Sequence, residues 1–190
     1  MFRGITLTVL LIGATFLPAC AQESDSKNKN LDIQSPVGNL HVGEDADAKR
    51  AGLPLYPGAR WKQHDSGSDS DSANLNLLTQ AFGMKLIVAN YVSSDDPSKI
   101  VEFYRGKLKK YGKVLECHSS KHGGDISVHE DNKGSGGDEL KCDENSGPVT
   151  ELKVGTENDQ HVVAVESADG GKGSNFALVY VHTRGKMGDL

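Results

Sequence analysis

Histidines gather in one polar stretch of the chain, residues 117–131, together with a cysteine and several carboxylates. Its potential metal ligands are Cys117, His118, His122, Asp125, His129, Glu130 and Asp131. Imidazole nitrogens with nearby carboxylates suit zinc, copper or nickel. The spacing is poor, however, because histidines four residues apart converge only on a helix, and Gly123-Gly124 disfavours a helix there. We interpret the stretch as a solvated loop, and a metal site on His118, His122 and His129 is the alternative.

Other combinations of reactive residues are weaker. Asp65, Asp69 and Asp71 could gather calcium, but the EF-hand spacing and its distal glutamate are absent from the sequence, which favours an acidic surface loop. Some registers of a hairpin formed by the last two predicted strands would place His161 opposite His182. The sequence has no G-x-S-x-G elbow, no H-E-x-x-H pair and no phosphate-binding glycine loop before a helix. We therefore predict no catalytic residues and a protein that is not an enzyme.

Two aromatic residues offer a candidate binding surface. Tyr56 and Trp61 lie on either side of Pro57-Gly58, and they would mark a patch for a ligand or partner if both were exposed. The alternative is that both side chains fill the space between a helix and a sheet, as large aromatic residues usually do.

The N-terminal segment has the composition of an export signal. A cationic start is followed by an apolar run over residues 5–16, which is too short to span a bilayer as a helix, and then by Leu17-Pro18-Ala19-Cys20. These four residues resemble the lipobox of bacterial lipoproteins. The resemblance implies that residues 1–19 are removed as a signal peptide and that Cys20 is acylated.

A lipoprotein of this kind carries its anchor on the new N-terminus. The resemblance implies a diacylglyceryl thioether and an N-acyl chain on Cys20, so we expect a covalent lipid, no other cofactor, and the lipid bilayer as a partner. Several acyl chains hold firmly where a single chain holds marginally. Ala21 resembles the corresponding residue of outer-membrane members, which predicts the periplasmic side of that membrane. The alternative is cleavage after Ala21, which would discard Cys20 and release a soluble secreted protein.

Charge and length exclude some classes of function. The full chain has 21 basic and 26 acidic residues, and residues 1–19 contain one arginine and no acid, so the mature chain keeps 20 basic and 26 acidic groups and a charge of −6. This acidic balance argues against nucleic acid as a partner, since its binding needs a basic face, and against a polybasic membrane patch. The roughly 170 mature residues suit one domain.

The cysteine count adds a constraint. With Cys20 assigned to the leader, Cys117 and Cys142 remain, and two thiols of an exported chain pair in an oxidising compartment. Their bridge closes a loop of 26 residues, which the chain-entropy model values at roughly 3–4 kcal/mol. Because the chain lacks C-x-x-C spacing, we predict a structural disulfide and not a redox site.

The mature chain divides into a tether and a domain. Residues 20–50 are polar and their few apolar residues are sparse, so we predict a flexible tether, with a short edge strand over residues 40–42 as an alternative. A single domain is expected over residues 51–186. It opens with two prolines and Gly58, which predict an extended segment and a type II turn.

Apolar periodicity predicts the elements of the domain. We expect strands over residues 60–64, 74–77, 84–92, 113–117, 138–142, 150–156, 161–167 and 176–183. A helix over residues 96–111 is expected between the third and fourth of them, with Asp96 as cap, Pro97 at its first position and Gly112 after its end. The fold class is α+β, an antiparallel sheet of about six to eight strands with this one amphipathic helix packed on one face.

A second resemblance covers part of the domain. Leu53-Pro54-Leu55-Tyr56-Pro57-Gly58-Ala59, followed by Asp96-Pro97 and Phe103-Tyr104, resembles a pattern in uncharacterised exported bacterial proteins. It implies a compact α+β module without an established activity. We therefore predict a membrane-anchored periplasmic lipoprotein that serves as a non-enzymatic binding or structural module. The alternative is a metal-binding or metal-buffering protein that uses the loop 117–131.

Overall fold

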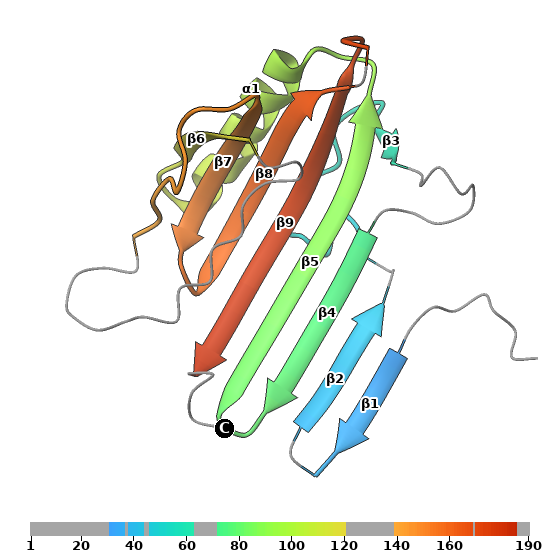
Figure 1. The fold of residues 1–190 in the computed structure, drawn as a ribbon, viewed down its shortest axis with the longest axis vertical. Helices are drawn as coiled ribbons and strands as arrows, with labels where there is room; N and C mark the ends of the chain where they lie inside the picture. The colour runs from blue at the N-terminus through green and yellow to red at the C-terminus, as the bar shows by residue number, and fades with distance from the viewer. Residues whose placement is uncertain are drawn as a thin grey trace, which may run out of the picture.

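A computed structural model describes residues 31–36, 38–43, 46–62, 72–120, 139–168 and 170–185. Within them, one antiparallel sheet and one α-helix make up the fold (Figure 1). The strands are β1 (Leu31–Ser35), β2 (Gly38–Gly43), β3 (Arg60–Trp61), β4 (Ser72–Thr79), β5 (Phe82–Ser93), β6 (Leu115–Ser119), β7 (Val149–Thr156), β8 (Asp159–Ser167) and β9 (Ser174–Gly185). Their order in space is β1-β2-β4-β5-β9-β8-β7-β6, and the short β3 also pairs with β5.

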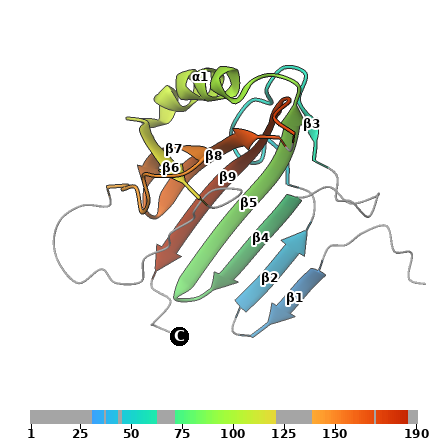
Figure 2. The same cartoon turned by 45° about the horizontal axis from the view of Figure 1, so that its top comes forward.

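The helix α1 (Pro97–Leu108) packs on one face of the sheet, over β7 and β8 (Figure 2). It begins where the sequence predicts, because the Asp96 carboxylate accepts a hydrogen bond from the Ser98 backbone N–H at 2.9 Å. Its last predicted turn is a 3-10 helix, Lys109–Tyr111, followed by Gly112 at a φ of 138°. The side chains that α1 buries against the sheet are Ile100, Val101, Tyr104 and Leu108.

The antiparallel sheet with one helix on one face is confirmed, but the balance of elements differs from the α+β prediction. The sheet has nine strands and the helix is short, so the described part of the chain is mostly β. The additional strands are β1 and β2, which occupy residues where the sequence predicted a tether.

β1 and β2 form as strands because β2 has a non-local partner in β4 and β1 pairs in turn with β2. Each of the two strands supplies only two large apolar residues, which is too few to signal a packed face. β2 nevertheless pairs along its whole length with β4, and this register sets Leu40 opposite Leu77 and Val42 opposite Leu75. The chain then returns to the core, where Ala46 and Ala48 are buried. The predicted tether therefore does not extend through residue 50.

The strand predicted over residues 138–142 is wrong in the described part of that range. Glu139 makes only an isolated bridge with Thr156, and the following residues have no regular pairing. Cys142 is instead held by its disulfide to Cys117, whose Cα lies 5.5 Å away. Covalent and side-chain bonds position this segment without a strand ladder.

The core has two apolar clusters on opposite faces of the sheet. The cluster beneath α1 combines the helix with inward side chains of β5, β7, β8 and β9, such as Ile87, Leu152 and Leu178. A second cluster on the other face consists of Val149, Val162, Ala164, Ala177, Val179 and Val181. Because β8 is buried on both faces, its sequence is a continuous apolar run and not an alternating one.

Candidate functional site

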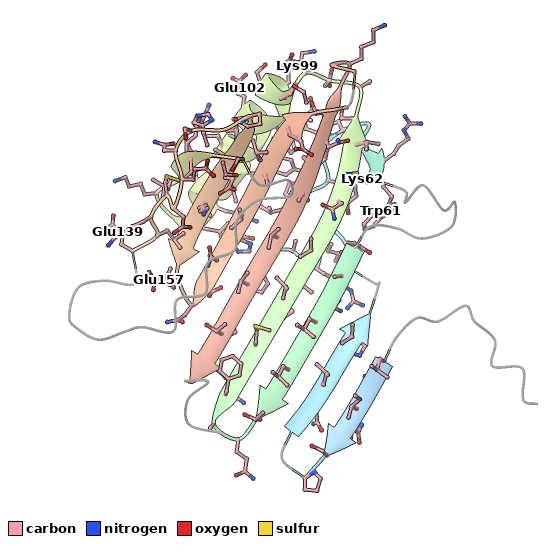
Figure 3. All side chains as sticks on the ribbon, in the orientation of Figure 1. Trp61, Lys62, Lys99, Glu102, Glu139 and Glu157 are labelled. Atoms are coloured by element: carbon pink, nitrogen blue, oxygen red, sulfur yellow. A yellow bond between two sulfur atoms is a disulfide. The ribbon has the colours of Figure 1, made fainter. Side chains whose placement is uncertain are left out.

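A cavity of about 530 Å³ opens where the segment before β3 passes beside β5. Among the described residues, Leu53, Leu55, Trp61 and Tyr91 give it apolar walls, and Asp47 and Lys49 bring opposite charges to it. Figure 3 shows Trp61 at the margin of the sheet, on β3. We call this hollow the Trp61 cavity.

The indole of Trp61 is held by a stack of aromatic rings that runs into the core. Trp61 lies opposite Tyr91 in the pairing of β3 with β5, and their ring centroids are 4.5 Å apart with planes 30° from parallel. Tyr91 stacks in turn on Phe176, at 5.5 Å. Tyr91 and Phe176 are buried, whereas Trp61 is 39% exposed. The stack therefore fixes an exposed ring on a rigid base, so little side-chain freedom remains to be lost when a ligand stacks on it.

The polar wall of the cavity is a tight turn over residues 47–53. Backbone hydrogen bonds close it, from Ala51 N–H to the Asp47 carbonyl and from Leu53 N–H to the Ala48 carbonyl. The Ala48 N–H also donates to the Tyr91 hydroxyl at 2.9 Å, which ties this wall to the floor of the cavity. Burial raises the pKa of Tyr91, so the phenol stays neutral.

Gly52 is required where this turn meets the helix end. Its φ is 75°, and a Cβ there would lie 2.9 Å from the Tyr111 hydroxyl and 3.0 Å from Cε1 of His161. The Tyr111 hydroxyl donates to the Gly52 carbonyl at 2.5 Å. The backbone therefore passes so close to Tyr111 and His161 that a side chain at position 52 would collide with them.

His161 is a buried residue that sequence reasoning treated only as half of a histidine pair. Its ring stacks between Tyr111 and Tyr180, with centroid distances of 3.9 and 4.8 Å. Nδ1 lies 3.0 Å from the Ala51 carbonyl, so this nitrogen carries the proton and donates it. Burial lowers the pKa of His161. The neutral imidazole of His161 on β8 is therefore hydrogen-bonded to the turn that lines the Trp61 cavity.

The register separates the two histidines that a hairpin might have brought together. His161 pairs with Tyr180, whereas His182 pairs with Asp159. The aromatic residues that stack on His161 are visible in the sequence, but the strand register that brings them together cannot be predicted from it.

The structure also separates the predicted aromatic patch. Tyr56 is buried, its ring edge-on to Phe103 at 5.1 Å, and its hydroxyl donates to the Asp95 carboxylate at 2.8 Å. That hydrogen bond, with a further one from Lys99, lowers the pKa of Asp95. Tyr56 is a core residue, and only Trp61 of the pair faces solvent.

The candidate metal ligands are only partly described. His118 lies on β6, where its backbone N–H donates to the Asn145 side chain at 3.2 Å. His122 and His129 lie outside the described residues, as do Asp65, Asp69 and Asp71. Within the described ranges, histidines, cysteines and carboxylates form no group of three that could hold a metal ion.

A disulfide and a buried ion pair close the far edge of the sheet. Cys117 pairs with Cys142, as the cysteine count predicts. Beside them, Lys153 Nζ lies 3.2 Å from Glu151 and 3.6 Å from Asp143, and the Ser119 hydroxyl donates to Glu151 at 2.5 Å. Lys153 and Glu151 are buried and paired with each other, and the ion pair from Lys153 to the more exposed Asp143 connects them to the segment around Cys142.

The leader with Cys20 lies outside the described residues. No helix in the part of the chain that the structure describes is long and apolar enough to cross a membrane. We found no family model, no curated protein and no solved structure that matches this chain, so the fold and the Trp61 cavity are what the chain offers for a functional argument.

Proposed function

We propose that this protein is a lipid-anchored binding module of the bacterial cell envelope, held by acylated Cys20 on the periplasmic side of the outer membrane, which takes a small ligand in the Trp61 cavity without chemical conversion. The observation that carries the ligand site is the exposed indole of Trp61, which lines a cavity of about 530 Å³ and rests on the buried Tyr91 ring. Cavities of roughly 300–1,000 Å³ with apolar walls and few polar groups are typical of small-molecule sites.

The lining defines the chemistry of the ligand. A flat apolar ring face, of a sugar or of an aromatic group, stacks on the indole, as rings do on exposed tryptophan. Leu53 and Leu55 add apolar contact, while Asp47 and Lys49 meet polar groups at the edge of the ring. A ligand with one apolar face and a polar edge therefore fits better than an alkyl chain or a free ion.

The ligand site can be tested through a convenient feature of the chain. Trp61 is its only tryptophan, so intrinsic emission reports on the cavity alone. We expect chitin-derived oligosaccharides, which do not fluoresce, to shift this emission in a saturable way. Calorimetry on Trp61→Ala should show lost binding, while Trp61→Phe keeps part of it and Lys62→Ala, the matched control next to the cavity, keeps all of it. Saturable binding that survives in Trp61→Ala would place the site elsewhere.

The anchor needs a separate test. Intact mass of the membrane-extracted protein should show acyl chains on a mature chain that begins at Cys20, and Cys20→Ser should abolish them. A released chain that begins at Gln22 would mean that an ordinary signal peptidase cuts after Ala21 and that the anchor proposal is wrong.

A further inference from the structure

The sheet continues beyond the helix as three strands, β4, β2 and β1 (Figures 1 and 2). The strand registers give these strands an apolar face on the side opposite α1. The register aligns the large apolar side chains across these strands. Leu31 and Ile33 of β1 lie opposite Val42 and Leu40 of β2. The same two β2 residues lie opposite Leu75 and Leu77 of β4, respectively. We call this set the extension face. Its members are Leu31, Ile33, Leu40, Val42, Leu75 and Leu77.

The extension face is uncharged and carries six large aliphatic residues, whereas the reverse side of the same strands is mostly polar. The other described residues on the face are Ser35, Gly38, Ala73 and Thr79. The reverse side carries Asp32, Gln34, Asn39, His41, Ser72, Asn74 and Asn76, with Leu78 as its one large apolar residue, 42% exposed near the end of β4. There, the His41 ring bonds the Asp32 carboxylate at 2.6 Å. The extension is therefore amphipathic across its thickness.

The exposure of this face increases away from the core. Leu75 and Leu77 are half-buried, Val42 is 37% exposed, and on β1 Ile33 is 47% and Leu31 is 54% exposed. Aliphatic side chains that are this exposed and form one contiguous set are typical of a binding surface.

The position of the anchor identifies what covers it. β1 begins at Leu31, eleven residues after Cys20. A chain of that length spans at most about 40 Å even when fully extended. A lipid on Cys20 therefore keeps β1 close to the bilayer surface. Every residue of β1 is exposed, and the helix-covered strands lie toward the other end of the sheet.

We propose that the extension face docks on the bilayer that holds the Cys20 lipid, with the aliphatic side chains at the boundary between headgroups and acyl chains; this rests on the proposed anchor. An uncharged aliphatic surface enters this boundary without desolvating an ion, and its polar reverse side stays in water. The outer edge of β1 pairs with no strand of the described chain. Its free N–H and C=O groups keep the extension at the hydrated interface and out of the hydrocarbon.

Neighbouring residues of β1 provide a matched test. Ile33 and Gln34 are both exposed but point to opposite faces. Cys20 is consumed by acylation in this proposal and the other two cysteines are paired, so Ile33→Cys or Gln34→Cys gives a unique thiol for a polarity-sensitive fluorophore. The full acylated protein would be reconstituted in vesicles of phosphatidylethanolamine and phosphatidylglycerol, with or without spin-labelled lipid. We expect the spin label to quench emission at position 33 about twofold and to leave position 34 nearly unchanged.

The outcomes separate this inference from the anchor. Acylated protein, verified by intact mass, in which both positions are quenched equally or neither is quenched would overturn the docking and leave the anchor intact. A second outcome is a blue shift at position 33 that grows with the density of protein in the vesicles and is not quenched by the spin-labelled lipid. It would assign the extension face to a second copy of the chain and would also overturn the docking on the bilayer. Protein without acyl chains would refute the anchor and, with it, the docking.

Discussion

The two parts of the sheet share one backbone architecture and differ in what covers them. β5, β9, β8 and β7 with α1 form the covered half, in which β8 is buried over most of its length. β4, β2 and β1 form the extension, in which every residue of β1 is exposed. All of these strands pair antiparallel in continuous register. Strand pairing alone therefore does not produce a core, and a layer packed on the sheet is needed.

Side-chain hydrogen bonds of the helix also cross-link the covered half. Tyr104 of α1 donates from its hydroxyl to the Pro54 carbonyl and accepts from the Tyr56 N–H, which joins the helix to the segment between β2 and β3. The extension has instead the exposed His41–Asp32 pair, and such surface pairs contribute little stability. The two regions should respond differently to matched substitutions.

Removing a leucine from each region should give the largest contrast. Leu178 is completely buried beneath α1, so Leu178→Ala should lower the free energy of unfolding by about 2–5 kcal/mol. Leu77 is half-buried on the extension, and Leu77→Ala should cost roughly 1 kcal/mol because solvent fills the space. Urea unfolding followed by circular dichroism measures both. Equal losses would show that the extension belongs to the same packed core.

Reduction of the disulfide should affect β6 and the neighbouring β7 of the covered half, and not the extension. Opening Cys117–Cys142 should lower the free energy of unfolding by about 3 kcal/mol, because the unfolded chain gains the entropy of the open loop. Hydrogen exchange should then quicken in β6 and β7, which lie beside the bridge, and stay the same in β1 and β2. Equal acceleration in all four strands would show that the two regions unfold as one unit.

The neutral His161 should make the covered half sensitive to acid. Burial lowers its pKa below the ordinary value of 6.5, so the unfolded chain binds a proton more readily than the folded one below that pH. The contribution of neutral His161 to the free energy of unfolding is therefore complete above pH 6.5. It is lost as the pH falls through the lowered pKa, with a slope of at most about 1.4 kcal/mol per pH unit.

His161→Phe isolates this effect. It keeps a ring between Tyr111 and Tyr180 but leaves the Ala51 carbonyl without its donor, which should cost about 1–3 kcal/mol at pH 7. Denaturant titrations from pH 7 to 5 should then show a shallower loss of stability than in the parent protein, with His182→Phe, at a half-exposed histidine of β9, as control. A variant that is as acid-sensitive as the parent would assign the pH dependence to other groups.

The two regions also differ in how well their sequences predicted them. Asp96, Pro97 and Gly112 marked α1 because capping and chain termination are local effects, and Cys117 with Cys142 followed from counting. β1 was not predicted, and β2 was only an alternative, as an edge strand over residues 40–42. The reason is that β2 depends on pairing with β4, which is distant in the sequence, and β1 pairs in turn with β2. The His161 stack and the burial of Tyr56 depend on register and on helix placement, and neither is encoded in a local pattern.

The smallest effect is expected at the outermost strand. Ile33→Thr keeps a β-branched side chain on β1 and removes apolar surface that is already 47% exposed, so the free energy of unfolding in detergent-free buffer should change by less than about 0.5 kcal/mol. Urea unfolding at pH 7 measures it, beside Gln34→Thr on the polar side of the strand. An isoleucine that contributes so little to folding leaves its apolar surface available for the proposed contact with the bilayer. A loss near that of Leu178→Ala would instead make Ile33 a core residue and remove the distinction between the two regions.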